Sequence, residues 1–134
     1  MDHSELEERE ALAVNDAFYA AFRGRDMARM AAIWSREHLV ACAHPGWQML
    51  YGRETVLASW KAILKSESSP PIESRDARVF VHGKVAVVTC VEQIFDARLV
   101  ATNVFVREAG GFRLVHHHAG PFSEQELRES APLN

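Results

Sequence analysis

Cysteine is scarce in this chain, and apolar runs long enough to cross a membrane are missing. The two cysteines, Cys42 and Cys90, cannot form the framework of several disulfides that holds small secreted domains together. No apolar stretch approaches the roughly 18 residues of a membrane span. Residues 1–10 are acidic, whereas a signal peptide begins with a basic segment followed by an apolar one. We therefore expect a cytoplasmic protein with reduced thiols.

An excess of basic charge is also missing. The 15 Lys and Arg residues are outnumbered by 18 Asp and Glu, so the formal net charge is -3. This balance argues against binding to a nucleic-acid backbone, which requires a basic face. The chain contains no glycine-rich phosphate loop, no G-x-S-x-G elbow and no H-E-x-x-H pair. We therefore expect no nucleic-acid or membrane partner, and neither nucleotide hydrolysis, serine esterase chemistry nor zinc proteolysis.

The composition that remains is that of one globular domain. The chain has 134 residues, of which 48% are hydrophobic and 25% charged. This length suits a single hydrophobic core and is too short for two. One segment, 66–71, is rich in residues that break secondary structure. We expect a single domain over residues 1–134, with its core at about 5–122 and a polar tail at 123–134.

Apolar residues at helical spacing predict a first helix over residues 6–22. Val14, Phe18 and Phe22 recur every four residues and form one stripe along it. Gly24 is a suitable residue to end this helix.

Two more helices and a short strand are expected before residue 66. Asp26 can cap a second helix, which carries Met30 and Trp34 on its apolar face. A strand is expected over residues 39–43, and a third helix after Gly52.

The second half of the chain predicts four consecutive strands, at 73–82, 84–95, 98–108 and 112–119. Helices followed by such a meander indicate an α+β fold, with N-terminal helices packed on a curved, mostly antiparallel sheet. In the second of these strands Val85 and Val87 lie on one face, and Ala86 and Val88 on the other. One face can pack on the helices, and we expect a second subunit to cover the other in a homodimer.

The run of three histidines near the end of the chain is the most conspicuous polar feature. Strict strand alternation places His116 and His118 on one face with Phe112 and Leu114, and His117 on the other. Two imidazoles on an apolar face can relay protons near neutral pH. The alternative is that both are hydrogen-bonded within a core or an interface.

Metal binding by these histidines would need a third ligand, for which His44 is available. The chain offers no closely spaced ligand motif, so we expect neither a metal nor a cofactor.

Asn103 and Glu92 are polar residues on apolar strand faces. Asn103 alternates with Ala101 and Phe105, and when buried it must find hydrogen-bond partners. It could donate to a ligand carbonyl, orient a histidine or bond to the backbone. Glu92 could be an acid or base with a raised pKa, or it could pair with an arginine such as Arg107.

His44 ends the predicted strand at 39–43 and precedes a patch of large apolar residues that includes Trp47. It could face a ligand as a base of ordinary pKa, or it could lie in a surface turn.

Two segments of the chain resemble the SnoaL-like branch of the NTF2-like superfamily: DMARMAAIWSREHLVACAHPGWQMLYGRETVLASW and ATNVFVREAGGFRLVHHHAGP. With the order of helices and strands, the resemblance covers about residues 5–122. The ending is also similar to the association domain of calcium/calmodulin-dependent kinase II, including its H-x-H. The resemblance implies a helix-lined cone closed by a curved sheet, the fold of delta-5-3-ketosteroid isomerase, scytalone dehydratase and polyketide cyclases.

The resemblance also implies roles for individual positions. His44, before Pro45, occupies the position of the general-base Asp of ketosteroid isomerase. Phe18, with Tyr19 next to it, occupies the position of the oxyanion-hole Tyr, so that donor is lost, and Asn103 replaces the second donor, a protonated Asp, with an amide. Cyclases of this fold place acid and base groups on the late strands. The resemblance thus implies catalytic roles for four residues: His44, Asn103, His116 and His118.

The expected function is cofactor-free acid/base chemistry, such as isomerisation, dehydration or cyclisation, on a small apolar or carbonyl-containing molecule in an enclosed pocket. The alternative is a non-catalytic ligand-binding or oligomeric assembly module. The residues expected to contact the ligand are Phe18, Tyr19, Trp34, Trp47, Tyr51 and Glu92.

Overall fold

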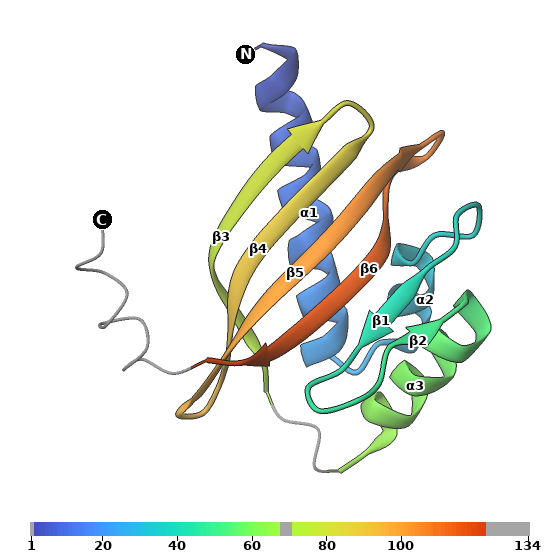
Figure 1. The fold of residues 1–134 in the computed structure, drawn as a ribbon, viewed down its shortest axis with the longest axis vertical. Coiled ribbons are helices and arrows are strands. Elements are labelled where there is room, and N and C mark those ends of the chain that lie inside the picture. The colour runs from blue at the N-terminus through green and yellow to red at the C-terminus, as the bar shows by residue number, and fades with distance from the viewer. Residues whose placement is uncertain (1, 68–70, 123–134) are drawn as a thin grey trace.

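A computed structural model describes residues 2–67 and 71–122, which form three helices packed against one curved sheet (Figure 1). The helices are α1 (His3–Arg23), α2 (Met27–Ile33) and α3 (Arg53–Lys65). The strands are β1 (Ala41–Ala43), β2 (Leu50–Tyr51), β3 (Glu73–His82), β4 (Val85–Ile94), β5 (Ala97–Glu108) and β6 (Gly111–Pro121). The polar tail expected at 123–134 lies outside the described residues.

The ends of the first two helices follow from local hydrogen bonds. The Asp26 carboxylate accepts a hydrogen bond from the Arg29 backbone amide and begins α2, as predicted. Gly24 ends α1, and its amide donates to the Ala20 carbonyl over 2.8 Å. Trp34 differs from the prediction, because it follows the last turn of α2 as its C-cap and is buried there.

The sheet has the strand order β2-β1-β6-β5-β4-β3. The strands from β3 to β6 form the predicted antiparallel meander, and β1 pairs parallel to β6. In Figure 1, α1 runs behind the meander, while α2 and α3 lie beside β1 and β2. The expected α+β fold, with helices on a curved and mostly antiparallel sheet, is confirmed.

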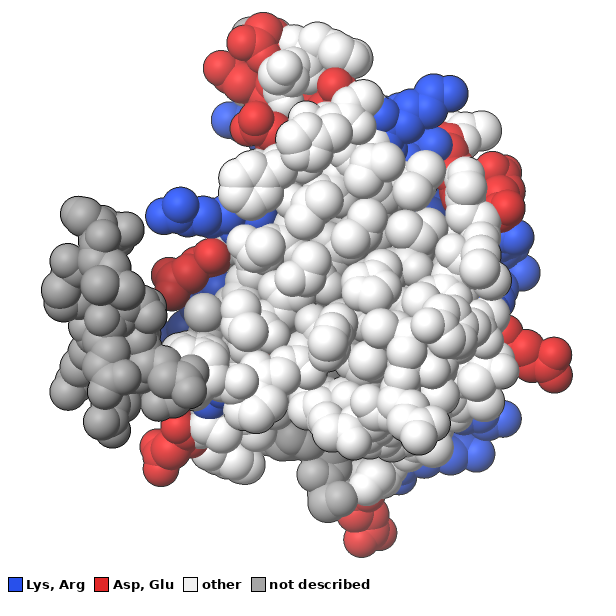
Figure 2. All heavy atoms as spheres, in the orientation of Figure 1, with Lys and Arg blue, Asp and Glu red and all other residues white. Residues whose placement is uncertain are grey.

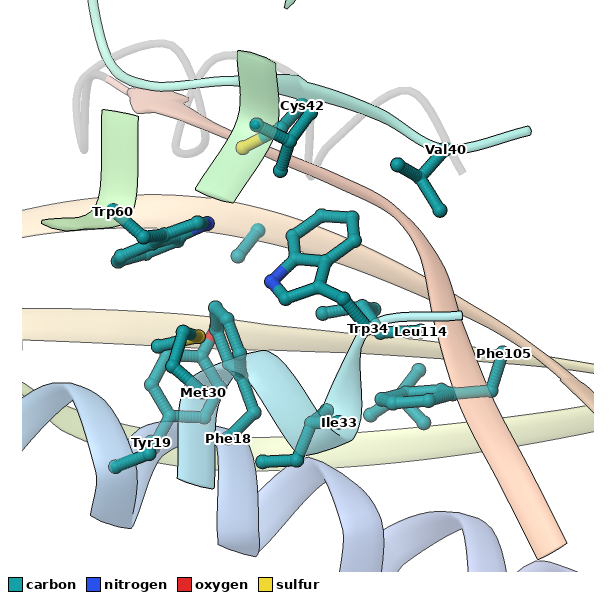
Figure 3. Close-up of a cluster of buried hydrophobic side chains, with 14 of the residues drawn as sticks. Phe18, Tyr19, Met30, Ile33, Trp34, Val40, Cys42, Trp60, Phe105 and Leu114 are labelled. Carbon is teal, nitrogen blue, oxygen red and sulfur yellow. The ribbon is translucent and has the colours of Figure 1, made fainter. Parts of the chain in front are cut away.

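The hydrophobic core lies between the helices and one face of the sheet. In Figure 3, Phe18 and Met30 lie close together beside the helices, and Phe105, from the sheet, lies beside Ile33 in the same cluster. The same inner face of β4 buries Ala86 and Val88, whereas its valines of opposite alternation are only half-buried. No helix in the described ranges is long and apolar enough to cross a membrane.

An irregularity in β6 reverses the expected placement of the three histidines. Val104 pairs with His116, but the next residue of β5, Phe105, pairs with Leu114, so Val115 is an extra residue in β6. Such a bulge shifts the alternation by one residue. His117 therefore points inward and is 1% exposed.

The expectation that His116 and His118 share the inner face of the sheet is consequently wrong. They pair with Val104 and Thr102, and they lie on the outer face, where His116 is half-buried and His118 exposed.

Candidate functional site

A cavity of about 190 Å³ opens between the C-terminal ends of α1 and α3 and the turn that joins β4 to β5. Its walls are mostly apolar, and its polar groups are two imidazoles, one carboxyl group and the indole N–H of Trp47. The lining residues are Phe22, His44, Pro45, Trp47, Ile63, Ile72, Glu92, Ile94, Leu99 and His117. An apolar cleft with a few convergent polar groups is the usual form of a small-molecule site.

Glu92 is the acidic group of this pocket. Its side chain is 2% exposed, and its Oε2 accepts a hydrogen bond of 2.6 Å from the Tyr19 hydroxyl. Burial raises the pKa of the carboxyl to about 7, although the hydrogen bond from Tyr19 lowers it. Near neutral pH, Glu92 therefore exists in both protonation states.

His117 is held opposite Glu92 by a network that begins on α1. The Asn103 amide group donates to Asn15 Oδ1 over 2.8 Å and to the Tyr19 hydroxyl over 3.2 Å. Its oxygen is therefore left to accept from Nδ1–H of His117. This hydrogen bond leaves a lone pair on Nε2 of His117, which lies 3.8 Å from Oε2 of Glu92.

His117 is neutral in this setting. Burial, and to a smaller extent the neighbouring imidazoles of His44, His116 and His118, together lower the pKa of its imidazole to about 3.

His44 is the second imidazole of the pocket, and its tautomer is also determined by its neighbours. The Ser59 hydroxyl donates its only proton to the Val56 carbonyl over 2.6 Å, so it accepts from Nε2–H of His44 over 2.9 Å. Burial lowers the pKa of His44 to about 4. Its ring packs edge-on against Trp47 and Trp60, with both pairs of ring centres 4.8 Å apart.

The structure brings most of the predicted site residues together. His44, Trp47 and Glu92 line the pocket, and Tyr19 and Asn103 belong to the hydrogen-bond network behind it. Phe18 is fully buried, and its ring centre lies 5.0 Å from that of His117.

Four predicted residues lie elsewhere. Tyr51, on β2, is 64% exposed and does not line the pocket. Trp34 lines a different hollow, and His116 and His118 lie on the outer face of the sheet.

Sequence reasoning missed His117, Asn15 and Ser59 as components of the site. Asn15 could have been found, because it lies four residues after Ala11 and four before Tyr19 on the buried stripe of α1. No residue type in the sequence marks the bulge that turns His117 inward.

A larger hollow, of about 370 Å³, is lined by two members, Glu37 and Glu108, of the one group of three potential metal ligands among the described residues; the third member is His38. Glu108 Oε2 already accepts hydrogen bonds from Ser35 Oγ over 2.6 Å and from His38 Nδ1 over 2.7 Å. These contacts account for the cluster without an ion. The smaller pocket is the better candidate site because its polar groups are buried and have altered pKa values.

Comparison with known proteins identifies the family of this chain. Residues 11–122 match the SnoaL-like domain family. The structure is similar to a candidate dehydratase of the NTF2-like family from Streptomyces avermitilis, with 31% identity, a TM-score of 0.82 and coverage of 90% of this chain and 99% of that one.

Two further relatives differ in their described roles. A candidate calcium/calmodulin-dependent protein kinase type II association domain from Thiobacillus denitrificans is 35% identical, with a TM-score of 0.70 and coverage of 83% of this chain and 94% of that one. The F-box protein SKIP8 of Arabidopsis thaliana is 26% identical over 113 residues, which is 83% of this chain and 49% of that protein. The chain thus spans about half the length of this curated relative.

Proposed function

This chain belongs to the SnoaL-like family of the NTF2-like proteins, and we propose that it is an enzyme that performs cofactor-independent acid/base chemistry on a small, largely apolar molecule. The proposal rests on the buried pair formed by Glu92 and His117, which we call the floor of the pocket. A carboxyl group with a pKa of about 7, that of Glu92, lies opposite the neutral imidazole of His117. A group whose pKa is close to the working pH is the most effective proton carrier.

Dehydration is the reaction that this floor suits best. Ionised Glu92 removes the proton from the carbon beside a carbonyl group, and the carbon–carbon double bond forms as the carbon–oxygen bond to the hydroxyl breaks. Glu92 then gives the same proton to the departing hydroxide, which leaves as water, and the carboxylate is regenerated. The Streptomyces relative, described as a candidate dehydratase, supports this choice of reaction.

The other polar residues have distinct roles in this proposal. His44 and His117 stay neutral, and the free lone pair on Nε2 of His117 accepts the hydrogen bond of the substrate hydroxyl group. Asn103 is a positioning residue, since both hydrogens of its amide are already donated, to Asn15 and to Tyr19. His116 and His118 face away from the pocket and take no part.

The test uses 4-hydroxy-4-phenyl-2-butanone, a one-ring hydroxyketone whose dehydration product absorbs in the near ultraviolet. We expect the wild-type protein to accelerate its dehydration and Glu92→Gln to reduce that rate by at least about 100-fold. The matched control is Glu73→Gln, which alters a carboxylate that is 59% exposed and paired with Arg75. Equal rates for Glu92→Gln and the wild type would contradict the assignment.

A second candidate function, oligomeric assembly, is supported by the outer face of the sheet. Figure 2 shows this face as a broad area without charged side chains, with Lys, Arg, Asp and Glu gathered around its edge. Val100 is 51% exposed there and Phe80 48%, beside half-buried valines of β4 and β5: Val85, Val87, Val91, Val104 and Val106. A large exposed apolar patch with a polar rim is typical of an interface.

We propose that a second copy of the chain covers this face in a homodimer, which is compatible with the pocket on the opposite side of the sheet. The association-domain relative supports assembly. The test is analytical ultracentrifugation of Val100→Glu beside Leu39→Glu, which alters an apolar residue that is 78% exposed and lies outside the sheet. We expect Val100→Glu to dissociate the dimer and Leu39→Glu to leave it intact. A wild-type protein that sediments as a monomer would refute the proposal.

The state of the thiols suits a reducing compartment, and we propose that the protein works in the cytoplasm. Cys42 and Cys90 are both free and buried, and burial raises the pKa of each thiol.

A further inference from the structure

We propose that the substrate of this pocket is a neutral alcohol whose apolar body is no larger than about one ring, and that its hydroxyl group donates a hydrogen bond to Glu92 or His117. This inference rests on the proposed function, because it names the class of molecule that the same site would act on. It follows from the hydrogen-bond acceptors of Glu92, His117 and His44 that have no partner within the protein.

Four polar side chains around Glu92 use their hydrogen-bond donors within the protein. Nδ2–H of Asn15 and the indole N–H of Trp60 have no partner among the described residues, but neither residue lines the pocket. Tyr19 donates its hydroxyl proton to Glu92, and Asn103 donates both amide hydrogens to α1. His117 donates Nδ1–H to Asn103, and His44 donates Nε2–H to Ser59. For a ligand carbonyl oxygen, the donors that remain in the pocket are the proton of Glu92 and the indole N–H of Trp47, whose side chain is half exposed to solvent.

Acceptors, in contrast, remain available. Within the described residues, no hydrogen bond reaches Oε1 of Glu92, Nε2 of His117 or Nδ1 of His44. Polar groups that are buried without a partner cost free energy, and a ligand that satisfies them gains it back. A hydroxyl group has the proton that these atoms lack, so an alcohol is better matched to the floor than a ketone.

The charges of the lining residues restrict the class of ligand further. None of the described residues that line the pocket is Lys or Arg, so an anionic ligand would meet Glu92 without a compensating cation. Burial also shifts the pKa values of Glu92, His44 and His117 toward their uncharged forms. An environment that disfavours charge on three of its own groups also disfavours a charged ligand.

The volume of the pocket limits the size of the ligand. A cavity of about 190 Å³ is smaller than the range typical of drug-sized ligands, which begins at about 300 Å³. An engineered apolar cavity of about 150 Å³ in another protein holds benzene. The pocket therefore has room for one ring and a short substituent, and its apolar walls match such a body: Phe22, Trp47, Ile63, Ile72, Ile94 and Leu99.

The experiment is an NMR titration with four probes of the same heavy-atom count: 1-phenylethanol, acetophenone, protonated 1-phenylethylamine and benzoate. The indole N–H signal of Trp47 reports on the pocket, and that of Trp34, which lines the other hollow, is the control for non-specific binding. We expect 1-phenylethanol to bind at least about tenfold more tightly than each of the other three. Tighter binding of acetophenone, of the amine or of benzoate would overturn the inference.

The variant Glu92→Gln tests whether Glu92 causes the preference for 1-phenylethanol over acetophenone. A glutamine amide can still accept from Tyr19 and can present its N–H groups to the ligand. We therefore expect the preference for 1-phenylethanol over acetophenone to fall by at least about fivefold in this variant. An unchanged preference would show that groups other than Glu92 determine which ligand binds.

The two proposals fail in different ways. If the alcohol binds preferentially but no hydroxyketone is dehydrated, the proposed reaction is wrong and the ligand class stands. If dehydration occurs while the ketone or benzoate binds more tightly than the alcohol, the ligand class is wrong and the reaction stands.

Discussion

The inner and outer faces of β4, β5 and β6 each include side chains that simple burial would not favour there. The inner face, against the helices, includes the polar residues Glu92, Asn103 and His117, each at most 2% exposed. The outer face is dominated by valines and has Val100 half exposed. Buried polar groups and exposed apolar groups each cost stability unless they find partners. The proposed acid/base chemistry would use the polar groups of the inner face, and the proposed homodimer would cover the apolar outer face.

The largest effect is expected from removing the centre of the inner network. Asn103→Leu leaves His117, Asn15 and Tyr19 without a shared partner, and each unsatisfied group costs about 1–3 kcal/mol. We expect the free energy of unfolding, measured with urea, to fall by about 4 kcal/mol.

The control for Asn103→Leu is Thr102→Val, which lies next to it on the outer face. We expect a change within about 0.5 kcal/mol, as for most substitutions outside the core. Equal destabilisation by both variants would mean that the two faces do not differ in the way described.

A smaller effect is expected from the protonation of Glu92. Its folded-state pKa is about 7, above the ordinary value of 4.5, so the folded protein binds this proton more tightly than the unfolded chain does. The stabilisation is complete below pH 4.5 and is lost as the pH rises through about 7. We expect wild type to gain up to about 3 kcal/mol over Glu92→Gln as the pH falls from 7.5 to 4.5.

The measurement is urea unfolding of both proteins across this pH range. The titrations of His44 and His117, whose lowered pKa values destabilise the folded state as the pH falls below about 6.5, occur in both proteins and cancel in the difference. A difference that does not change with pH would mean that Glu92 titrates alike in the folded and unfolded states.

The smallest effect concerns two adjacent histidines on opposite faces. His117→Ala removes the ring that packs on Phe18 and leaves the Asn103 oxygen unsatisfied, so we expect a loss of about 2 kcal/mol. His116→Ala removes a half-buried outer ring, and for the isolated monomer we expect a change within about 0.5 kcal/mol. Thermal unfolding at one protein concentration compares them in the Val100→Glu background, which we expect to be monomeric, and the reverse order would place His116 inside.

The sequence predicted the helices and the meander because their signals are local. Asp26 and Gly24 cap or end helices through hydrogen bonds to residues within four positions of them. The short strand β2 (Leu50–Tyr51) was not predicted, because two residues carry no periodicity and the strand is defined only by pairing with β1.

The candidate site was predicted only in part, and the reason is the register of β6. Glu92 and Asn103 lie in regular strands, so their alternation placed them correctly on the inner face. The extra residue Val115 lies between regular segments, and it is the pairing with β5 that determines which histidine turns inward. The pairing of β6 with β5, which the local sequence pattern does not reveal, therefore determines that His117 faces Glu92 and that His116 and His118 do not.

The most direct test of the account is a ¹³C NMR titration of the Glu92 carboxyl carbon in the wild-type protein, assigned with Glu92→Gln. The account predicts an apparent pKa of about 7 for this group, because the carboxyl is buried opposite a neutral imidazole. A midpoint near the ordinary value of 4.5 would contradict it. The carboxylate would then be a weaker base, poorly matched to take a proton from carbon and return it near neutral pH.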